Sequence, residues 1–152
     1  MKNPVRQWLF VAGLALVATS PTAEASAVSE ARATFDKALA AFNARDYSAY
    51  EAFFTDDVEA FTGVYTPFRF IGKAKWIAFL RGLDAYASVN YDQRHSECRS
   101  YNDDTVLCNG YFVFSTVSKS GVATVQSGRE STTMVKIKGK WLIANYHFSA
   151  MF

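Results

Sequence analysis

Two histidines occur in the 152-residue chain, and His147 lies in a strand-like segment near its end. If Lys138-Gly139 is a two-residue hairpin loop, His147 faces Glu130 across two neighbouring strands. A carboxylate that hydrogen-bonds an imidazole fixes its tautomer and raises its basicity, which suits proton abstraction or activation of water near neutral pH. The simpler alternative is a structural pair that joins two strands, because interior histidine–carboxylate pairs are often only satisfied polar groups.

The other predicted turns, Ser118 to Gly121 and Asn102 to Asp104, bring more polar side chains to the same face of the sheet. A mixture of polar and aromatic groups is costly in a dry core, so this face lines a cavity or meets solvent. Asn145 and Tyr111 could donate hydrogen bonds to an oxyanion, or bond to backbone or water. The predicted face contains Gln93, His95, Glu97, Asn109, Tyr111, Val113, Glu130, Thr132, Asn145 and His147.

The two cysteines, Cys98 and Cys108, are predicted to lie opposite each other in a hairpin. In an oxidising compartment such a pair is a candidate disulfide, and the alternative is two buried thiols in neighbouring strands. We expect no metal, because the chain has no His-x-His or Cys-x-x-Cys spacing. We expect no cofactor, because the chain has no glycine-rich phosphate loop and no dinucleotide-binding fingerprint.

The N-terminal residues have the composition of a secretory signal. Lys2 and Arg6 precede the apolar run Trp8 to Ala18, and two small-x-small motifs end at Ala25 and Ala27. We predict a signal peptide over residues 1–27, cleaved after Ala25 or Ala27, and a mature domain over residues 28–152 in the periplasm or outside the cell. An uncleaved membrane anchor is the alternative. The predicted mature domain is nearly neutral, without clustered lysines or arginines, so we expect no nucleic acid partner.

Helical spacing precedes strand-like segments in the predicted mature domain. A helix from Ser29 to about Ala44 is followed by a short helix capped by Asp46, a short strand over residues 58–63 and a loop over residues 64–72. A helix from Lys73 carries Trp76 on its inner side, and four long strands follow about Ser88. Helices first and an antiparallel meander after them predict an α+β domain with the helices on one sheet face.

The C-terminal run Gly139 to Ser149 (GKWLIANYHFS) resembles the last strand of nuclear transport factor 2-like (cystatin-like) domains. These include the SnoaL-like proteins and the association domain of calcium/calmodulin-dependent protein kinase II, whose C-terminal end is the most similar. Glu130-Ser131-Thr132 and Asp46 to Tyr50 are also similar, and the resemblance covers about Val28 to the end.

The resemblance implies a curved sheet wrapped round helices like a cone. It also implies a pocket lined by the face with Glu130 and His147, and a homodimer or larger ring. By analogy Trp76 forms part of the pocket wall. Val113 and Thr132 stand where the kinase association domain has arginines, so the resemblance disfavours an anionic ligand.

Three functions are consistent with these features. The first is an exported, oligomeric module whose pocket binds a small, fairly neutral molecule through Asn145, Tyr111, Asn109, Thr132, Val113 and Trp76. The second is a cofactor-free isomerase, cyclase or dehydratase that uses His147 and Glu130 as a dyad. The third is a purely structural assembly domain. A deep cavity separates the first two functions from the third, because an assembly domain fills this face with its own side chains.

Overall fold

The computed structural model describes residues 22–63 and 68–151; residues 1–21, with most of the predicted signal, lie outside the described residues. Among the described residues, no helix has the length and apolarity needed to cross a membrane. The elements are α1 (Thr22–Asn43), α2 (Tyr47–Glu51), β1 (Phe54–Gly63), β2 (Phe68–Ile71), α3 (Lys73–Leu80), the 3-10 helix η1 (Arg81–Ala85), β3 (Tyr86–Asn102), β4 (Thr105–Ser118), β5 (Ala123–Ile137) and β6 (Lys140–Ala150).

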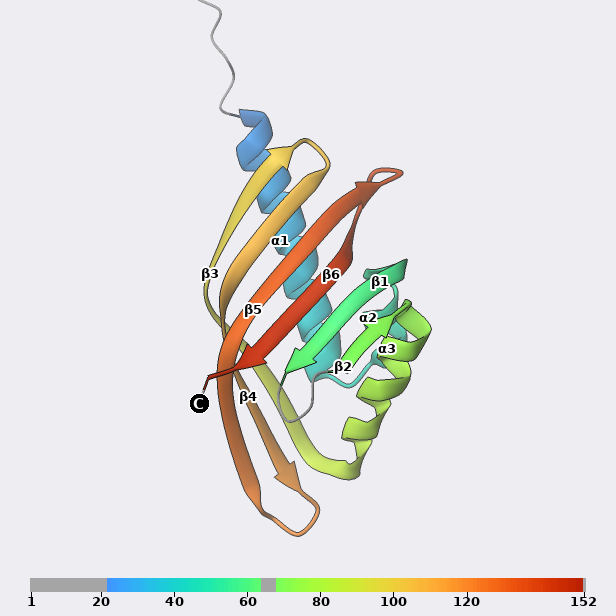
Figure 1. The fold of residues 1–152 in the computed structure, drawn as a ribbon, viewed down its shortest axis with the longest axis vertical. Helices are drawn as coiled ribbons and strands as arrows, with labels where there is room; N and C mark the ends of the chain where they lie inside the picture. Colours follow the sequence, from blue (N-terminus) through green and yellow to red (C-terminus); the bar gives the residue numbers. More distant parts are fainter. Residues whose placement is uncertain (1–21, 64–67, 152) are drawn as a thin grey trace, which may run out of the picture.

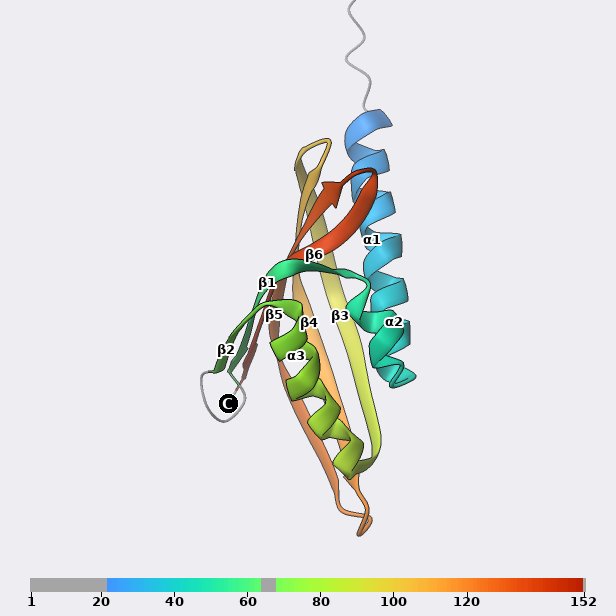
Figure 2. The ribbon, with the colours of Figure 1, turned by 90° about the vertical axis from the view of Figure 1, so that its right-hand side faces the viewer.

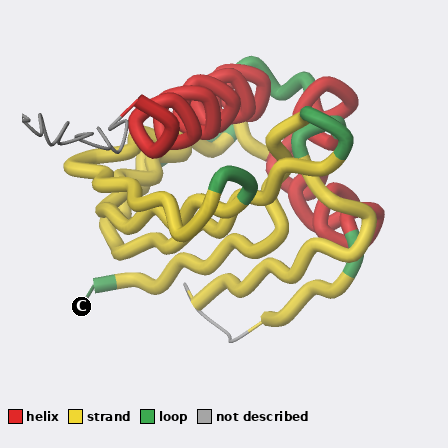
Figure 3. The backbone as a smooth tube through the Cα atoms, turned by 90° about the horizontal axis from the view of Figure 1, so that it is seen from above, coloured by secondary structure: helices red, strands yellow, loops and turns green. Residues whose placement is uncertain are grey.

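One six-stranded sheet has the order β2-β1-β6-β5-β4-β3. The last four strands form the predicted antiparallel meander, and β1 joins its edge by pairing parallel to β6. Figure 1 shows the long strands curving past the α1 helix. From above, the helices cover one side of the sheet and the other side carries only strands (Figure 3). The predicted α+β class, with helices on one sheet face, is therefore confirmed.

The α1 helix packs along the covered side of the sheet (Figure 2). Its buried residues Ala31, Phe35, Ala38 and Phe42 recur every three or four positions, which places them on one side of a helix. The stripe confirms the predicted packing face, although α1 begins earlier than Ser29 and extends across the predicted cleavage motifs. We call the side of the sheet that faces α1 the inner face and the opposite side the outer face.

The segment between β1 and α3 differs from the predicted loop over residues 64–72. Residues 68–71 form β2, which pairs antiparallel with β1 from Glu59↔Ile71 to Thr62↔Phe68. A proline only one position before this short strand is compatible with an edge strand. The β1 strand is also longer than predicted, because it begins at Phe54 and not at Val58.

A β-bulge in β6 changes the predicted pairing of β5 with β6. The pairing predicted from the two-residue turn is correct near the loop, where Met134 opposes Ile143. The next pair is Thr133↔Asn145, and Ala144 is the extra residue. The loop between β4 and β5 is also one residue longer than predicted, because Val117 opposes Ala123. A one-residue slip moves every side chain of a strand to the other face. Glu130 and Thr132 therefore lie on the inner face, and the prediction that they share a face with Asn109 and His147 is wrong.

A second bulge lies in β3. Arg94 opposes Tyr111, the next paired residue is Glu97, and His95 has a positive φ of 49°. The bulge sends the Gln93 side chain to the inner face while Glu97 stays exposed, so the prediction that they share a face is wrong. Gly110 of β4 allows the bulge to lie close against its neighbouring strand, because a Cβ at this position would lie only 3.0 Å from the Cα of Ser96.

Candidate functional site

A cavity of about 370 Å³ lies between the helices and the inner face of the sheet. It is predominantly aromatic, and none of the described residues that line it is charged. The size is in the range of small-molecule sites, which are mostly apolar with a few polar groups. The lining residues are Leu39, Phe42, Tyr50, Thr62, Trp76, Phe79, Gly82, Leu83, Tyr86, Tyr91, Phe112, Phe114, Tyr146 and Phe148.

Aromatic rings in edge-to-face and stacked contacts build the cavity wall. Trp76 stacks on Phe79 at 5.7 Å between ring centroids and meets Tyr146 edge-to-face at 6.3 Å. Phe112 fits against the backbone of β5 because Gly128 has no side chain. A Cβ there would lie 2.4 Å from the Phe112 ring and 2.2 Å from a backbone oxygen. The shape of the cavity therefore depends on this close approach of β4, β5 and β6.

The polar groups beside the cavity converge on Glu130. The Tyr91 hydroxyl and the Gln93 amide donate to its two carboxylate oxygens, and the Tyr146 hydroxyl lies 3.3 Å from Oε2. Glu130 itself is only 3% exposed. Burial raises the pKa of Glu130, and its hydrogen bonds with Tyr91, Gln93 and Tyr146 oppose the shift. Burial likewise raises the pKa values of Tyr91 and Tyr146, so both hydroxyls stay protonated near neutral pH.

The position of Tyr91 is fixed by the end of α1. The Asn43 side chain donates to the Tyr91 carbonyl at 2.9 Å and accepts from its backbone N–H at 2.8 Å. The Phe42 ring packs edge-to-face on the Tyr91 ring, and the Phe112 ring stacks on it at 5.2 Å. The Tyr91 hydroxyl is thereby aimed at Glu130 with little freedom to turn elsewhere.

His147 and Glu130, predicted as a pair, lie on opposite faces of the sheet. Glu130 opposes Phe148, whereas His147 opposes Ser131, is exposed and packs edge-to-face on Phe61 at 6.0 Å. The bulge at Ala144 causes this separation. The dyad is not assembled, and the prediction that these two residues face each other is wrong.

Most of the other predicted binding residues also lie away from the cavity. Asn109 and Tyr111 line a separate groove on the outer face with His95 and Glu97, and Asn109 accepts a hydrogen bond from Ser131 at 2.7 Å. The remaining residues are distributed as follows: Val113 opposes Ser127, Asn145 opposes Thr133, and Thr132 is buried opposite Cys108 and Tyr146. Among the predicted binding residues, Trp76 alone lines the inner cavity.

Sequence reasoning missed Tyr91 and Tyr146 as residues beside the cavity, and it placed Gln93 on the face with Glu130 without naming it as a site residue. Tyr91 and Gln93 lie in a very polar strand, and the bulge at His95 hides which of its residues turn inward. Neighbouring side chains of a strand point to opposite faces, so either Tyr146 or His147 had to face the cavity. The predicted pairing, which lacked the bulge at Ala144, assigned that face to His147.

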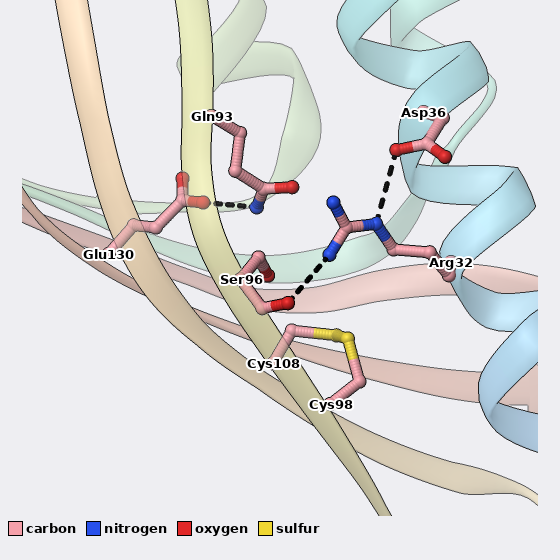
Figure 4. Close-up of a disulfide and its surroundings, with 7 residues drawn as sticks. All are labelled: Arg32, Asp36, Gln93, Ser96, Cys98, Cys108 and Glu130. Atoms are coloured by element: carbon pink, nitrogen blue, oxygen red, sulfur yellow. Dashed lines mark hydrogen bonds and ion pairs between the residues drawn. A yellow bond between two sulfur atoms is a disulfide. The ribbon is translucent and has the colours of Figure 1, made fainter.

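Cys98 and Cys108 oppose each other in β3 and β4 and form a disulfide, as Figure 4 shows. The bridge lies beside the β3 bulge, where Arg32 of α1 donates to the Ser96 carbonyl at 3.2 Å. It therefore fastens the strand that carries Gln93 and Tyr91. Among the described residues, no group of three or more histidine, cysteine, aspartate or glutamate side chains is placed to hold a metal ion.

A curved sheet packed on its helices around an aromatic cavity defines the class of small α+β pocket domains. The family model of the SnoaL-like domain matches residues 31–152, and the chain belongs to this family. The resemblance to SnoaL-like and nuclear transport factor 2-like proteins inferred from the sequence is thereby confirmed. A search of curated protein sequences finds no match.

Solved structures share the fold at low identity. An NTF2-like protein of unknown function from Pseudomonas putida KT2440 is 19% identical, with a TM-score of 0.70 over 84% of this chain and 89% of that chain. A ketosteroid isomerase-like protein from Erwinia carotovora atroseptica is 21% identical, with a TM-score of 0.68 over 82% and 96%. The association domain of C. elegans CaMKII is 14% identical, with a TM-score of 0.67 over 83% and 97%.

Proposed function

We propose that the protein binds a small, uncharged, largely apolar molecule in the inner cavity. The observation that carries this function is the cavity of about 370 Å³ with an aromatic and aliphatic lining. Planar apolar molecules gain free energy there by leaving water and by stacking on Trp76, Phe112 and Phe148.

The uncharged state of the ligand follows from the groups around the cavity. A charged ligand would lose its hydration without gaining an ionic partner, since no described lining residue is charged. Glu130 adds a disadvantage for anions, because its carboxylate lies behind the hydroxyls of Tyr91 and Tyr146. We therefore expect neutral compounds to bind and carboxylates of the same size to be excluded.

The experiment is calorimetric titration of the purified domain with naphthalene-based probes of equal ring size. Neutral 2-naphthol is expected to bind and anionic 2-naphthoate is expected not to bind. A Leu83→Trp substitution fills part of the cavity and should abolish binding, whereas Leu107→Trp, in the outer groove, should leave it unchanged. Equal binding to both tryptophan variants, or no binding to the unsubstituted domain, would show that the cavity is not a ligand site.

Proton-transfer catalysis is the second candidate, and the specific observation in its favour is Glu130, a buried carboxyl with a raised pKa beside the cavity. Such a group can act as an acid or base near neutral pH. Glu130 does not line the cavity, however, and Tyr91, Gln93 and Tyr146 occupy its oxygens. Binding is therefore the first proposal. Turnover of a carbonyl compound that is lost in Glu130→Gln, with binding retained, would favour catalysis.

We also propose self-association through the outer face of the sheet. No described helix covers this face, and Tyr111 and Phe61 are 46% and 36% exposed there. The similar C. elegans structure is an association domain. Sedimentation velocity tests the proposal: Tyr111→Asp should shift the domain to monomer, and Ala78→Asp on α3 should not. A domain that is monomeric without substitution at high concentration would contradict it.

Export is the remaining proposal, and the disulfide between Cys98 and Cys108 supports it because such bonds persist in oxidising compartments. Expression of the full chain in a bacterial host should deliver a shortened protein to the periplasm. Recovery of the uncleaved chain in the cytoplasm or in the membrane fraction would contradict this location.

A further inference from the structure

The hydroxyl protons of the two tyrosines beside Glu130 already take part in hydrogen bonds. A carboxylate only accepts hydrogen bonds, and a tyrosine hydroxyl has one proton to give. Tyr91 directs that proton to Oε2 of Glu130, Tyr146 shares its proton between Oε2 and the Tyr91 oxygen, and Gln93 donates to Oε1. What the two tyrosine oxygens still offer is their lone pairs, so toward a ligand they act as acceptors.

Protonation of Glu130 does not release the tyrosine protons. The amide oxygen of Gln93 is buried and has no hydrogen-bond partner in the described part of the chain. If Glu130 takes up a proton on Oε1, the Gln93 amide can turn and present this oxygen as the acceptor. Oε2 then remains an acceptor for Tyr91 and Tyr146. With the proton on Oε1, where the Gln93 oxygen can accept it, the two hydroxyls donate to Oε2 just as they do when Glu130 is charged.

The other hydroxyl groups of the cavity lining belong to Tyr50, Thr62 and Tyr86. A hydroxyl that rotates can donate to one ligand and accept from another, so these groups favour neither kind of ligand. Discrimination therefore rests on Tyr91, which Asn43 holds in place, and on Tyr146, which packs edge-to-face on the rings of Phe35 and Trp76.

We infer that the ligand bears a hydrogen-bond donor, a phenolic or alcoholic hydroxyl on an apolar ring system, and directs it at the oxygens of Tyr91 and Tyr146. This inference rests on the proposed function and narrows it from neutral molecules to neutral donors. Ketones and ethers of the same shape bring only acceptors, which would meet the lone pairs of the tyrosines and leave buried polar atoms unpaired.

The test compares 2-naphthol with 2-methoxynaphthalene and naphthalene by calorimetric titration of the unsubstituted domain. The two substituted compounds share the ring system and the oxygen, but only the naphthol has a proton to donate. We expect 2-naphthol to bind roughly ten-fold more tightly than 2-methoxynaphthalene, the ratio that one such hydrogen bond supplies. Tyr91→Phe should reduce this ratio toward one while naphthalene still binds. The matched control Tyr111→Phe, on the outer face, should leave the ratio unchanged.

The outcomes separate this inference from the function on which it rests. If naphthalene binds but the naphthol and its ether bind equally, or the ether binds more tightly, the donor inference is wrong and the binding function stands. If no compound of the set binds, both are wrong. The ratio in the unsubstituted domain decides the question even if Tyr91→Phe fails to fold.

Discussion

Glu130 faces Phe148 across β5 and β6, and this pairing turns the carboxylate toward the cavity side of the sheet. The residue that keeps His147 from this side is Ala144, the extra residue of the β6 bulge, because without it His147 would oppose Glu130. The chemistry available inside the domain is therefore that of a carboxyl group among tyrosines. The imidazole of His147 lies outside, against Phe61.

The pH dependence of stability reports on this buried carboxyl. Because burial raises the pKa of Glu130 above its ordinary value of 4.5, the folded state binds its proton more tightly than the unfolded state. Stability from this group is therefore fully present below the unfolded pKa and falls as pH rises through the folded pKa. Chemical denaturation from pH 5 to pH 8 should show this fall, and Glu130→Gln should flatten it.

Above pH 5 the change in stability contains no contribution from Glu30, a carboxylate whose pKa is lowered and not raised. Hydrogen bonds from Lys136, Trp141 and Ser26 lower the pKa of the exposed Glu30 to about 2, so its own contribution changes below that window. Glu30→Gln is the matched control and should keep the slope above pH 5. A Glu130→Gln variant with the same slope as the unsubstituted domain would mean that Glu130 is not held in a desolvated site.

The elements with regular periodicity were predictable from the sequence, and the site was not. The alternation of the four long strands and the spacing of Phe35 and Phe42 indicate an α+β domain with the helices on one side. The pairing Cys98↔Cys108 was also predicted correctly, although Asn102 pairs with Thr105 and the predicted three-residue loop is wrong; the register shift between Ser100 and Asn102 restores the predicted pairing. The inner face of β5 depends on a loop length and on the bulge at Ala144. Neither leaves a periodic signal, and an error of one residue exchanges the faces.

Gly128 should be intolerant of even the smallest side chain. A Cβ there would approach the Phe112 ring within 2.4 Å and a backbone oxygen within 2.2 Å, so β5 or Phe112 must move. We expect Gly128→Ala to lower the free energy of unfolding by about 1–3 kcal/mol, as overpacking does, and to weaken 2-naphthol binding. Gly82→Ala is the control, because a Cβ there has no atom within 4 Å. Equal stability of the two variants would contradict this account of the cavity wall.

Removal of the disulfide should cost stability without rearranging the sheet. The bridge joins residues separated by 10 positions in a hairpin. For a loop of this length the chain-entropy description gives a contribution of roughly 2–3 kcal/mol. We expect the Cys98→Ser, Cys108→Ser double variant, and the reduced unsubstituted domain, to lose about this amount in denaturant titrations. A much smaller loss in both would mean that the bridge adds little to the stability of this hairpin, and would contradict the chain-entropy description.

The two predicted cleavage sites differ in what they leave of α1. Cleavage after Ala25 keeps Ala27, which is 5% exposed in the core, and Ser26, whose hydroxyl donates to Glu30 at 3.1 Å. Cleavage after Ala27 removes both. Two purified domains, one beginning at Ser26 and one at Val28, should therefore differ in stability by about 1 kcal/mol in favour of the longer one, mainly through the buried Ala27 methyl.

A third domain, beginning at Ser26 and carrying Ser26→Ala, separates the two contributions. It should retain most of the stability advantage if burial of Ala27 dominates, because the bond from Ser26 to Glu30 is exposed and exchanges readily with water. N-terminal sequencing of the exported protein then compares the processed end with the more stable form, and we expect Ser26. If the domains beginning at Ser26 and Val28 are equally stable, the first turns of α1 contribute nothing to the core, and the structure gives no reason to favour either site.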